Sequence, residues 1–399
     1  MIPYGRQHVT QSDIDSVLEV LRSDFLTQGP TVPRFEKAVA ARVRARHAVA
    51  VNSATSALHV ACLALGLGEG DTLWTVPNTF VASANCGRYC GARVDFVDID
   101  PITWNMSVSA LASKLESAER TGHLPKVLVP VHFAGQPTQQ EAIWKLAERY
   151  GIRVLEDASH AIGSENQGEP VGSCRWSDVT VFSFHPVKII TSGEGGMAVT
   201  NDPELAERMA MLRSHGVTRD PARFVESRTT TVSSSTSVRG APPWYYEQQM
   251  LGFNYRMTDI QAALGLSQLD RLQAYVDRRN LLARSYEAAL RDSGLQLPYV
   301  CPGIISAYHL YVVRLKPEAC GREHREVFDE LRQRGIGVNL HYMPVHLQPY
   351  YRELGFREGQ LPEAEAHGRE AITLPLYPGL TDEMQEEVVN CVRGAVGLR

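Results

Sequence analysis

Short apolar stretches alternate with helix-like stretches between residues 47 and 213, and this alternation limits the possible folds more than any other feature of the chain. The apolar stretches are rich in Val, Ile and Leu, which is typical of strands buried on both faces. Strands that alternate with helices form mainly parallel sheets, because each helix carries the chain back to the same edge. The sequence therefore predicts an α/β fold, with a mostly parallel sheet and helices on both faces. The predicted strands are residues 47–51, 72–76, 93–97, 126–131, 153–156, 179–184 and 197–199.

The alternation ends after residue 213, and a second domain is expected beyond it. Residues 228–244 are rich in Ser, Thr, Pro and Gly and predict an exposed loop. Residues 258–290 then have the pattern of one long helix, for which Thr258 is a suitable N-cap. The remainder has the pattern of a smaller α+β domain. We expect a large domain at residues 1–257, with an N-terminal arm and an insertion loop at 218–250, followed by an interdomain helix and small C-terminal domain at residues 258–399.

Near the N-terminus, residues 10–23 have the pattern of an amphipathic helix. Thr10 or Ser12 would open this helix as its N-cap, since hydroxyl side chains accept hydrogen bonds from the free N–H groups at a helix start. The sequence thus predicts a capped helix with one apolar side. The apolar stripe consists of Ile14, Val17, Leu18 and Leu21.

Charge and hydropathy exclude several classes of function. The net charge is −5 and the isoelectric point is near 6.2, and the sequence has no basic tract that could neutralise nucleic-acid phosphates. No apolar run approaches the roughly 20 residues that a membrane-spanning helix needs. The first residues lack the apolar segment of a signal peptide. We therefore expect a cytoplasmic protein that binds neither nucleic acid nor membrane.

The seven cysteines are odd in number and scattered, which is typical of reduced thiols rather than of a disulfide framework. Cys86 and Cys90 are four residues apart and would share one face of a helix. A zinc site needs further Cys or His ligands at suitable spacing, and the sequence offers no such set. We predict no metal site, and a core-filling role for these two thiols.

A single lysine lies between a predicted buried strand and a glycine-rich turn in the segment DVTVFSFHPVKIITSGEGGMAVT, residues 178–200. Lys188 has Val187 and Ile189 as neighbours, so its ammonium group would be poorly solvated and its pKa lowered. An unprotonated amine is the nucleophile needed for Schiff-base chemistry. For an arbitrary lysine, however, an exposed position on a loop is the simpler interpretation. The choice between the two depends on the other motifs.

Four further motifs would fit one cofactor. Asp157 ends a predicted parallel strand, where open α/β sheets bind ligands, although it equally suits the capping of the turn that follows. Residues 51–56 lead from a strand into a helix and offer N–H groups and hydroxyls to a phosphate, although plain N-capping explains them as well. Phe80 could stack on a planar ring or fill the core. Asn254 and Arg256 lie among aromatic residues just before the predicted long helix.

In chain order these motifs are SATSAL, PNTF, LEDASHAIG, FSFHPVKIITSGEGG and NYRMTDIQAALG. In this order, and over nearly the whole chain, the sequence resembles the DegT-type sugar aminotransferases, which are pyridoxal-phosphate enzymes of the aspartate aminotransferase fold (fold type I). Three features are similar to the 4-aminotransferases of pseudaminic acid biosynthesis: IPYGRQ…SDFLTQGP, FHPVK…GEGG and PPWYYEQQMLGFNYRMTDIQ. That class aminates a UDP-linked 4-keto-6-deoxy-N-acetylhexosamine, with L-glutamate as donor and 2-oxoglutarate as product.

The resemblance implies pyridoxal 5′-phosphate as the cofactor, with pyridoxamine 5′-phosphate formed during turnover. Lys188 would hold the cofactor covalently and act as the base, and Asp157 would pair with the pyridine nitrogen. Phe80 would stack on the ring, and His160, where relatives often have Gln, would lie near the ring hydroxyl. Asn254 would reach the phosphate of a neighbouring subunit, which implies a homodimer. The phosphate seat would comprise Ala54, Thr55, Ser56 and Ser183.

For the substrates, the resemblance implies a second set of residues. Arg256 is the candidate clamp for the glutamate carboxylate or the diphosphate, because a guanidinium binds oxyanions bidentately. The loop at residues 218–250 is long enough to act as a lid. The sugar-nucleotide pocket would comprise Tyr4, Asp24, Phe25, Leu26, Thr27, His185, Tyr308 and His309.

Three alternatives fit parts of the sequence. Another keto-sugar nucleotide, carried on dTDP or GDP, would use the same cofactor motifs. A dehydratase is disfavoured, because relatives with that chemistry replace the lysine by histidine. A non-catalytic protein of the same fold is disfavoured by the joint presence of Lys188, Asp157 and Asn254. The sequence thus predicts a sugar-nucleotide aminotransferase, and the choice of sugar depends on the pocket residues.

Overall fold

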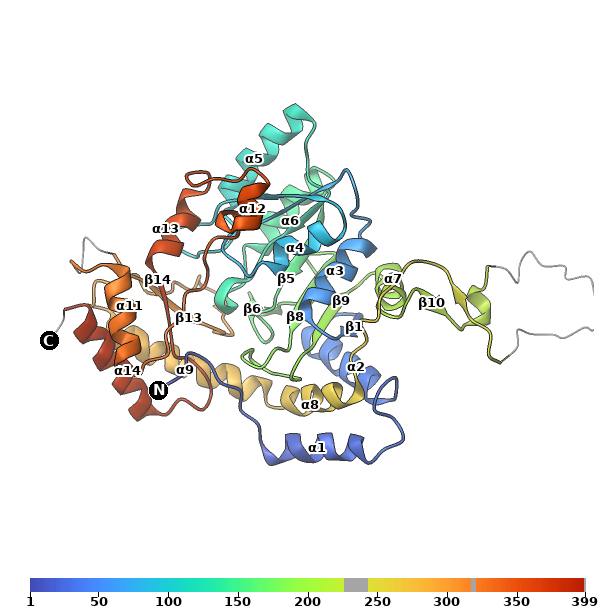
Figure 1. The fold of residues 1–399 in the computed structure, drawn as a ribbon, viewed down its shortest axis with the longest axis horizontal. Coiled ribbons are helices and arrows are strands. Elements are labelled where there is room, and N and C mark those ends of the chain that lie inside the picture. The colour runs from blue at the N-terminus through green and yellow to red at the C-terminus, as the bar shows by residue number, and fades with distance from the viewer. Residues whose placement is uncertain (226–242, 317–320, 398–399) are drawn as a thin grey trace, which may run out of the picture.

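The computed structural model describes residues 1–225, 243–316 and 321–397, and a seven-stranded sheet forms its centre (Figure 1). The strand order is β1-β9-β8-β5-β4-β2-β3. Neighbouring strands from β8 to β3 are parallel, whereas β9 is antiparallel to both β1 and β8. The prediction of a mostly parallel sheet is confirmed. The strands are β1 (His47–Val51), β2 (Thr72–Thr75), β3 (Arg93–Phe96), β4 (Val127–Val129), β5 (Arg153–Asp157), β8 (Val179–Ser183) and β9 (Gly196–Thr200).

The reversed direction of β9 follows from the way it is connected to β8. Residues 184–195 join the two strands without a helix, and a parallel neighbour would need a crossover. This connection contains Lys188 and also Gly193, whose φ of 82° lies in the left-handed region that favours glycine. The predicted glycine-rich turn is therefore the return of the chain into the sheet, and it leaves Lys188 just beyond the end of β8.

Helices cover both faces of the sheet, because successive side chains of a strand point to opposite faces. In β1, Val49 and Val51 pack in a core with α3 and α4, whereas Ala50 packs in a core with α2 and α8. In β8, Val181 and Phe182 divide between the same two cores. The helices around the sheet are α2 (Thr31–Val43), α3 (Ala54–Ala64), α4 (Ala82–Tyr89), α5 (Val108–Thr121), α6 (Gln140–Arg149), α7 (Pro203–Arg213) and α8 (Asp259–Leu269).

The stretch predicted as one long helix at residues 258–290 is two helices, α8 and α9 (Leu272–Leu290), so this prediction is wrong in detail. Thr258 is the N-cap of α8, as predicted: its hydroxyl accepts a hydrogen bond from the backbone N–H of Gln261, whose side chain accepts one in return. The break falls at residues 270 and 271, where the Arg271 side chain binds Asp13 near the N-terminus. Figure 1 shows α9 continuing toward the small domain.

The N-terminal helix α1 (Gln11–Leu21) has Thr10, one of the two predicted candidates, as its N-cap, and it docks on α8 through a buried carboxylate. Asp13 is fully buried and accepts hydrogen bonds of 2.7 and 2.6 Å from the side chains of Ser267 and Arg271. Burial alone would raise the pKa of Asp13, but these hydrogen bonds lower it to about 2. The predicted apolar stripe is left largely uncovered in the single chain: Ile14, Leu18 and Leu21 are 45%, 38% and 50% exposed.

Substitution Asp13→Asn is expected to loosen α1 from α8. The Arg271 guanidinium would lose its charged partner, which costs about 2 kcal/mol for a pair that is only partly screened by solvent. Because the folded-state pKa of Asp13 lies below its unfolded value, this contribution is complete above about pH 4 and is lost as the pH falls toward 2. Amide hydrogen exchange in residues 11–21 should be faster in the variant at pH 7, and the difference should shrink below pH 4. Equal exchange at pH 7 would contradict the prediction.

The C-terminal part of the chain forms a small α+β domain with its own hydrophobic core. The strands β13 (Tyr311–Arg314) and β14 (Ala371–Leu374) pair in antiparallel fashion. Three helices contribute to the same core: α9, α11 (His324–Gln333) and α14 (Asp382–Ala395). The expected α+β pattern is present here, whereas the division of the chain at residues 257 and 258 stays a prediction.

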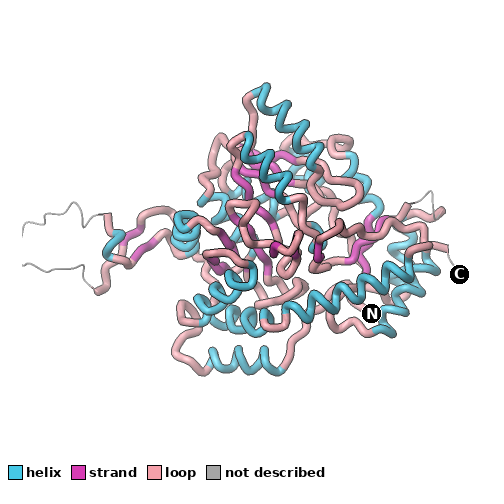
Figure 2. The backbone as a smooth tube through the Cα atoms, turned by 180° about the vertical axis from the view of Figure 1, so that it is seen from behind, coloured by secondary structure: helices cyan, strands magenta, loops and turns pink. Residues whose placement is uncertain are grey.

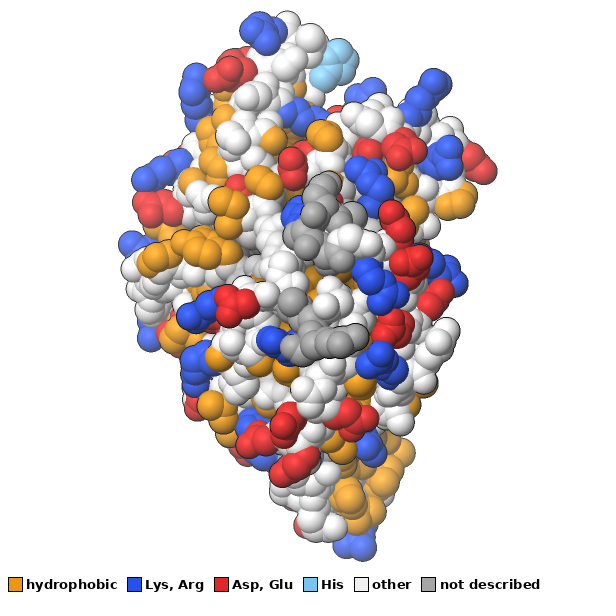
Figure 3. All heavy atoms as spheres, turned by 90° about the vertical axis from the view of Figure 1, so that its left-hand side faces the viewer, with side chains coloured by type: hydrophobic (Ala, Val, Ile, Leu, Met, Phe, Trp, Pro, Cys, Tyr) orange, Lys and Arg blue, Asp and Glu red, His pale blue; other side chains and the backbone are white. Residues whose placement is uncertain are grey.

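The surface at this end of the molecule has no concentration of one charge. Figure 3 shows acidic and basic side chains interspersed over this face. On α11, Arg325 pairs with Asp329 at 2.6 Å and Arg334 pairs with Glu330 at 2.5 Å. Among the described residues, none of the helices combines the length and the apolar character needed to cross a bilayer.

A two-stranded hairpin projects from the large domain, with β10 (Val217–Thr218) paired to β11 (Glu247–Gln248). Figures 1 and 2 show it at the opposite end of the molecule from the small domain. Most of the predicted exposed loop at 228–244 and much of the predicted lid at 218–250 lie outside the described residues. The remaining short elements are β6 (Glu165–Asn166), β7 (Glu169–Pro170), β12 (Ile304–Ile305), α12 (Pro349–Glu353) and α13 (Pro362–Glu370).

Candidate active site

A cavity of about 980 Å³ lies where β5 and β8 end and α3 begins. Ligands bind at this edge in open α/β sheets. Segments distant in sequence complete its wall, from Tyr4 near the N-terminus to residues 339–342 of the small domain. The predicted site residues that line the cavity are Tyr4, Ala54, Thr55, Ser56, Phe80, Asp157, His160, Ser183, His185, Lys188 and His309.

Lys188 presents its amine to this cavity from the connection that follows β8. Its Nζ atom lies 3.3 Å from Nε2 of His309. Burial lowers the pKa of Lys188 to about 8, and the nearby Asp157 carboxylate limits the shift because it favours the ammonium form. About one tenth of the amine is therefore unprotonated at pH 7. This is the lowered pKa that the apolar neighbours of Lys188 predicted.

Asp157 closes β5 and is only 4% exposed. Its Oδ2 atom accepts a 2.6 Å hydrogen bond from the Ser83 hydroxyl of α4, and its Oδ1 atom accepts a 3.0 Å hydrogen bond from the backbone N–H of Ser159. Ser83 in turn lies 2.8 Å from the hydroxyl of Thr79. The carboxylate therefore caps the turn, as one of the two interpretations predicted, and it also borders the cavity, whereas its pairing with a ligand stays a prediction.

Two histidines beside the amine are held in the neutral form. Burial lowers the pKa values of His160 and His309 well below the ordinary value, and the charge of Lys188 adds to the effect. In His160, Nδ1 accepts a 3.3 Å hydrogen bond from the backbone N–H of Ala134, which leaves Nε2 to donate to the Tyr342 hydroxyl at 3.2 Å. In His309, Nε2 faces Lys188, and the buried Nδ1 has no hydrogen-bond partner among the described residues.

The N-terminus of α3 also borders the cavity. Ser53 is the N-cap, and its hydroxyl accepts a 3.1 Å hydrogen bond from the backbone N–H of Ser56. The first N–H groups of a helix have no intrahelical acceptor and carry partial positive charge, so they favour an anion. Strand β9 approaches closely here, because a Cβ atom at Gly196 would lie 2.5 Å from the backbone nitrogen of Ala54. Glycine at this position therefore allows the helix start to sit against the sheet.

Sequence reasoning missed Ser83 and the small-domain segment at residues 339–342. His341 and Tyr342 line the cavity, and burial lowers the pKa of His341 to about 3. The Tyr342 ring is stacked with that of His160, with centroids 6.1 Å apart. The available signal was the phrase NLHYMP, whose polar aromatic residues suit a small-domain core poorly. Asn52 and Ser53, which belong to the predicted motif at residues 51–56, also line the cavity. Further lining residues that were not predicted are Thr79, Ser159, Glu194, Gln261 and Asn339.

Several predicted residues do not line the cavity of this chain. Asn254 is exposed, and Arg256 is half-buried and forms a backbone bridge to Val51. The carbonyl of Tyr308 accepts a 3.1 Å hydrogen bond from Arg279, at the edge of the small-domain core. Their assigned roles stay predictions, as do those of four exposed residues near α1: Asp24, Phe25, Leu26 and Thr27.

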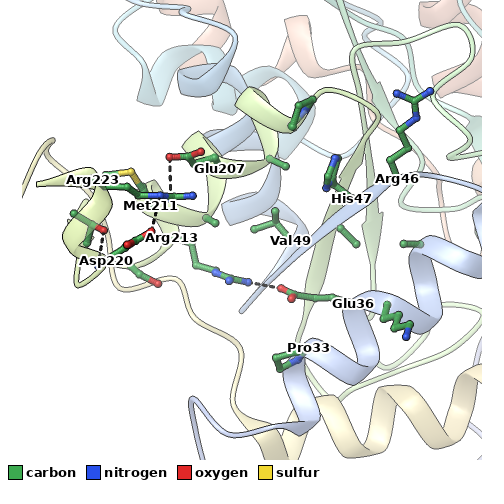
Figure 4. Close-up of a pocket in the computed structure, with 18 of the residues that line it drawn as sticks. Pro33, Glu36, Arg46, His47, Val49, Glu207, Met211, Arg213, Asp220 and Arg223 are labelled. Carbon is green, nitrogen blue, oxygen red and sulfur yellow. Dashed lines mark hydrogen bonds and ion pairs between the residues drawn. The ribbon is translucent and has the colours of Figure 1, made fainter.

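A second cavity, of about 840 Å³, lies between α2, β1, α7 and β10 (Figure 4). Charged residues in its wall pair with one another, Arg213 with Glu36 at 2.5 Å and Arg223 with Glu207 at 2.9 Å. Arg213 also donates a 2.7 Å hydrogen bond to the carbonyl of Ala50, which ties α7 to β1. None of the predicted site residues lines this second cavity, and most of them line the cavity around Lys188, which is therefore the candidate active site.

Comparison with known families decides what kind of protein carries this cavity. The sequence model of the DegT/DnrJ/EryC1/StrS aminotransferase family matches residues 7–393. The chain belongs to this family. The resemblance inferred from the order of the motifs is thus confirmed over nearly the whole chain.

Similar proteins with names or solved structures extend the comparison. The spore coat polysaccharide biosynthesis protein SpsC of Bacillus subtilis (strain 168) is 38% identical over 400 residues, which cover 99% of this chain and 97% of SpsC. Spr1654 of Streptococcus pneumoniae, in its PMP form, has a TM-score of 0.87 and 28% identity over 99% of both chains. Helicobacter pylori PseC, an aminotransferase involved in the biosynthesis of pseudoaminic acid, has a TM-score of 0.85 and 30% identity over 99% of both chains.

Enzymes of this family are PLP-dependent sugar aminotransferases of class EC 2.6.1, and Spr1654 has been solved in both PLP and PMP forms. The chain shares their fold, with a large mostly parallel sheet and a small α+β domain, so the expected fold class is confirmed. Within the described residues, no group of three or more His, Cys, Asp and Glu side chains is arranged to hold a metal ion.

Proposed function

We propose that this sugar aminotransferase uses pyridoxal 5′-phosphate to move the amino group of L-glutamate to C4 of a UDP-linked 4-keto-6-deoxy-N-acetylhexosamine. The observation that carries the proposal is a lysine amine of lowered pKa beside a buried carboxylate in one cavity. The likeness to PseC supports the choice of sugar. The reaction would be that of a UDP-4-amino-4,6-dideoxy-N-acetyl-β-L-altrosamine transaminase, EC 2.6.1.92, in pseudaminic acid biosynthesis.

The residues of the cavity fit this cofactor. The start of α3 offers free N–H groups to the phosphate, with the hydroxyl of Thr55 beside them. Asp157 offers its negative charge to a protonated ring nitrogen, and Phe80, 60% exposed at the cavity, offers an aromatic face for stacking. When bound, the cofactor supplies an aldehyde that joins to amines and a cationic ring that stabilises negative charge on the adjacent carbon.

Lys188 would first hold the cofactor and then move the proton. The Lys188 amine would take the proton from Cα of glutamate, and a pKa of about 8 suits that task near neutral pH. His160 and His309 are neutral, so they add no positive charge beside the cationic ring. The 3.3 Å contact with His309 holds the lysine side chain at the cavity. The same groups would act in reverse order on the C4 ketone of the sugar.

Substitution Ser83→Ala is expected to weaken the orientation of Asp157 without removing its charge. The carboxylate loses its 2.6 Å donor, and a buried oxygen left without that partner costs about 1–3 kcal/mol. We expect kcat to fall by roughly tenfold, since 1.4 kcal/mol of barrier is tenfold in rate. The absorbance of the bound cofactor should also change its pH dependence, because Asp157 sets the charge of the ring nitrogen. Ser83→Thr keeps a hydroxyl and should restore both properties. If the absorbance of the bound cofactor in Ser83→Ala had the same pH dependence as in the wild type, this role of Ser83 would be contradicted.

We also propose a homodimer in which Asn254 of each subunit reaches the phosphate site of its neighbour. Asn254 is exposed and does not line the cavity of its own chain. An apolar surface suited to a partner lies on and just after α1, where Ile14, Leu21 and Phe25 are 45%, 50% and 51% exposed.

A chain with Lys188→Ala and a chain with Asn254→Ala should each be inactive. When they are unfolded and refolded together, about one quarter of wild-type activity should return, because half of the dimers are mixed and each has one intact site. No recovery would contradict the shared site.

The choice of sugar is tested by a panel of 4-keto nucleotide sugars with L-glutamate as donor. We expect turnover of the UDP-linked 4-keto-6-deoxy-N-acetylhexosamine, with 2-oxoglutarate formed in equal amount. Exchange of UDP for dTDP or GDP should lower kcat/KM. Equal or faster turnover of a dTDP- or GDP-linked sugar would overturn the substrate assignment and leave the aminotransferase chemistry intact.

A second candidate substrate is supported by one specific comparison. The identity to SpsC, 38%, exceeds the 30% to PseC, and SpsC is named for spore coat polysaccharide biosynthesis. The alternative is therefore amination of another keto-sugar nucleotide, on dTDP or GDP. The cofactor residues would act in the same way, and the panel above distinguishes the two substrates.

A further inference from the structure

Both ring nitrogens of His160 are engaged in hydrogen bonds, and these contacts fix the protonation of the ring. Nδ1 accepts a 3.3 Å hydrogen bond from the backbone N–H of Ala134, and Nε2 lies 3.2 Å from the hydroxyl of Tyr342. A backbone N–H can only donate, so Nδ1 carries no hydrogen and the single hydrogen of the neutral ring is on Nε2. Burial, and then the neighbouring Lys188 and His341, also lower the pKa of this ring. His160 therefore donates its one hydrogen to Tyr342.

The Tyr342 hydroxyl accepts this hydrogen bond and keeps its own hydrogen free. A hydroxyl has one hydrogen to donate and two lone pairs, and His160 occupies only a lone pair. Among the described residues, the hydroxyl has no second hydrogen-bond partner. Burial raises the pKa of Tyr342, and the Asp157 carboxylate adds to this shift, so the hydroxyl stays protonated at neutral pH. Tyr342 lines the cavity together with Asp157 and Lys188, which leaves an unused donor at the cavity wall.

The position of Tyr342 is fixed by contacts on both sides of its peptide unit. Its backbone N–H donates a 3.3 Å hydrogen bond to Oδ1 of the buried Asn78, which follows β2 in the large domain. The carbonyl of the preceding His341 accepts a 3.0 Å hydrogen bond from Nε2 of His367 on α13. The ring itself is stacked with that of His160 at an interplanar angle of 16°. The hydroxyl is thus held at the cavity before any ligand binds, as a preorganised donor must be.

A purely structural role would not require this hydroxyl. The N–H of His160 needs only an acceptor, and in the same part of the molecule a backbone carbonyl serves the ring of His367 in that way. A tyrosine hydroxyl adds a hydrogen, and a donor in a largely enclosed site is favourable only when it meets an acceptor. The acceptor that completes this series of hydrogen bonds is therefore expected in the cavity.

We propose that Tyr342 is a further catalytic residue, whose hydroxyl donates its hydrogen bond to an oxygen of the bound reactants. The inference rests on the proposed function, in which two oxygens have the required chemistry of an acceptor without a hydrogen of its own. These are the ionised ring hydroxyl of the cofactor and the keto oxygen at C4 of the sugar. A neutral hydroxyl stabilises negative charge on either oxygen while its own proton stays in place.

The experiment uses Tyr342→Phe, which removes the hydroxyl and keeps the ring beside His160. If the acceptor is the ring oxygen, the cofactor-free variant should bind pyridoxamine 5′-phosphate roughly tenfold more weakly than the wild type, and both half-reactions should slow. If the acceptor is the keto oxygen, only the half-reaction with the sugar should slow, by roughly tenfold, and cofactor binding should be unchanged. Tyr351→Phe is the matched control, because the hydroxyl of Tyr351 donates a 2.7 Å hydrogen bond to Asn85 away from the cavity, and it should keep all three values.

The proposal would be overturned if Tyr342→Phe had the cofactor affinity and both half-reaction rates of the wild type. Nitrogen NMR of histidine-labelled, cofactor-free protein provides a readout that needs no turnover, with the His160 signals assigned by their loss in His160→Gln. His160 should carry its hydrogen on Nε2 and should not titrate between about pH 5 and pH 8. A hydrogen on Nδ1, or titration near the ordinary value of about 6.5, would also overturn the proposal. Failure of the proposed function is distinguishable, because it would appear in the wild type as the absence of a half-reaction with L-glutamate.

Discussion

Replacement of Lys188 by arginine is expected to abolish amino transfer while the protein stays folded. Arginine keeps the positive charge but has no deprotonated form near neutral pH, so it neither joins to the cofactor aldehyde nor takes the Cα proton. We expect kcat with L-glutamate to fall by on the order of 10⁴-fold or more. The half-reaction with glutamate alone measures this directly, because it needs no sugar substrate.

The control for this prediction separates attachment of the cofactor from folding. Borohydride reduction of the wild type should fix the cofactor on the peptide that contains Lys188, and the Lys188→Arg variant should retain none. Lys145→Arg is the matched control, because the side chain of Lys145 is 64% exposed on α6, and it should behave as the wild type. Turnover by Lys188→Arg within tenfold of the wild type would contradict the assigned role.

The lowered pKa of Lys188 provides an independent test in the protein without cofactor. Since its pKa is about 8, the neutral fraction of the amine should rise with a midpoint near pH 8, compared with about 10.4 for an ordinary lysine. The acetylation rate of Lys188, followed by peptide mass spectrometry, should therefore approach its plateau above about pH 9. A rate that still rises steeply beyond pH 9 would show that the amine is solvated.

The parts of the fold that follow from local pattern were predictable from the sequence. The strand His47–Val51 has the bounds that its apolar residues indicate, because burial in the sheet requires that pattern. The break between α8 and α9 was not predictable in this way. It lies where Arg271 reaches Asp13, more than 250 residues earlier in the chain, and the helical pattern continues through it.

For the site, the sequence indicated the motifs that lie at strand ends and missed the groups that support them. Lys188 and Asp157, which both line the cavity, could be singled out because strand ends and glycine-rich turns have local signatures. Ser83 was missed because a buried serine in a helix has no local signature, and its role depends on a carboxylate 74 residues away. Tyr342 was missed for the same reason, since it meets His160 only after the small domain has packed on the sheet.

Substitution Asp157→Asn is expected to have the second largest effect on turnover. Asparagine has nearly the same shape, and its Oδ1 atom can still accept the hydrogen bond from the backbone N–H of Ser159. Its NH2 group would take the place of Oδ2 and can donate to the Ser83 hydroxyl, so the pocket should keep its form. The charge is lost, however, and the ring nitrogen of the cofactor would no longer be held in its protonated state. A neutral ring stabilises negative charge poorly, and we expect kcat for the glutamate half-reaction to fall on the order of 10³-fold. The absorbance of the bound cofactor should change, while its binding weakens less than turnover does.

Glu156 provides the control for this prediction. It distinguishes the effect of losing a negative charge at the cavity from the effect of losing one elsewhere in the interior. Glu156 precedes Asp157 on β5, and its side chain points to the opposite face of the sheet, where it accepts hydrogen bonds of 2.7 and 2.8 Å from Gln140 and Thr180. Glu156→Gln removes the same charge one residue away and should lower stability while the turnover of each folded molecule stays near that of the wild type. The prediction would be contradicted if kcat of Asp157→Asn stayed within tenfold of the wild type, or if kcat of Glu156→Gln fell as far as that of Asp157→Asn. In either case the ring nitrogen would need another partner. Because the two side chains share one strand, this pair tests the position of a charge at the cavity and not merely its presence.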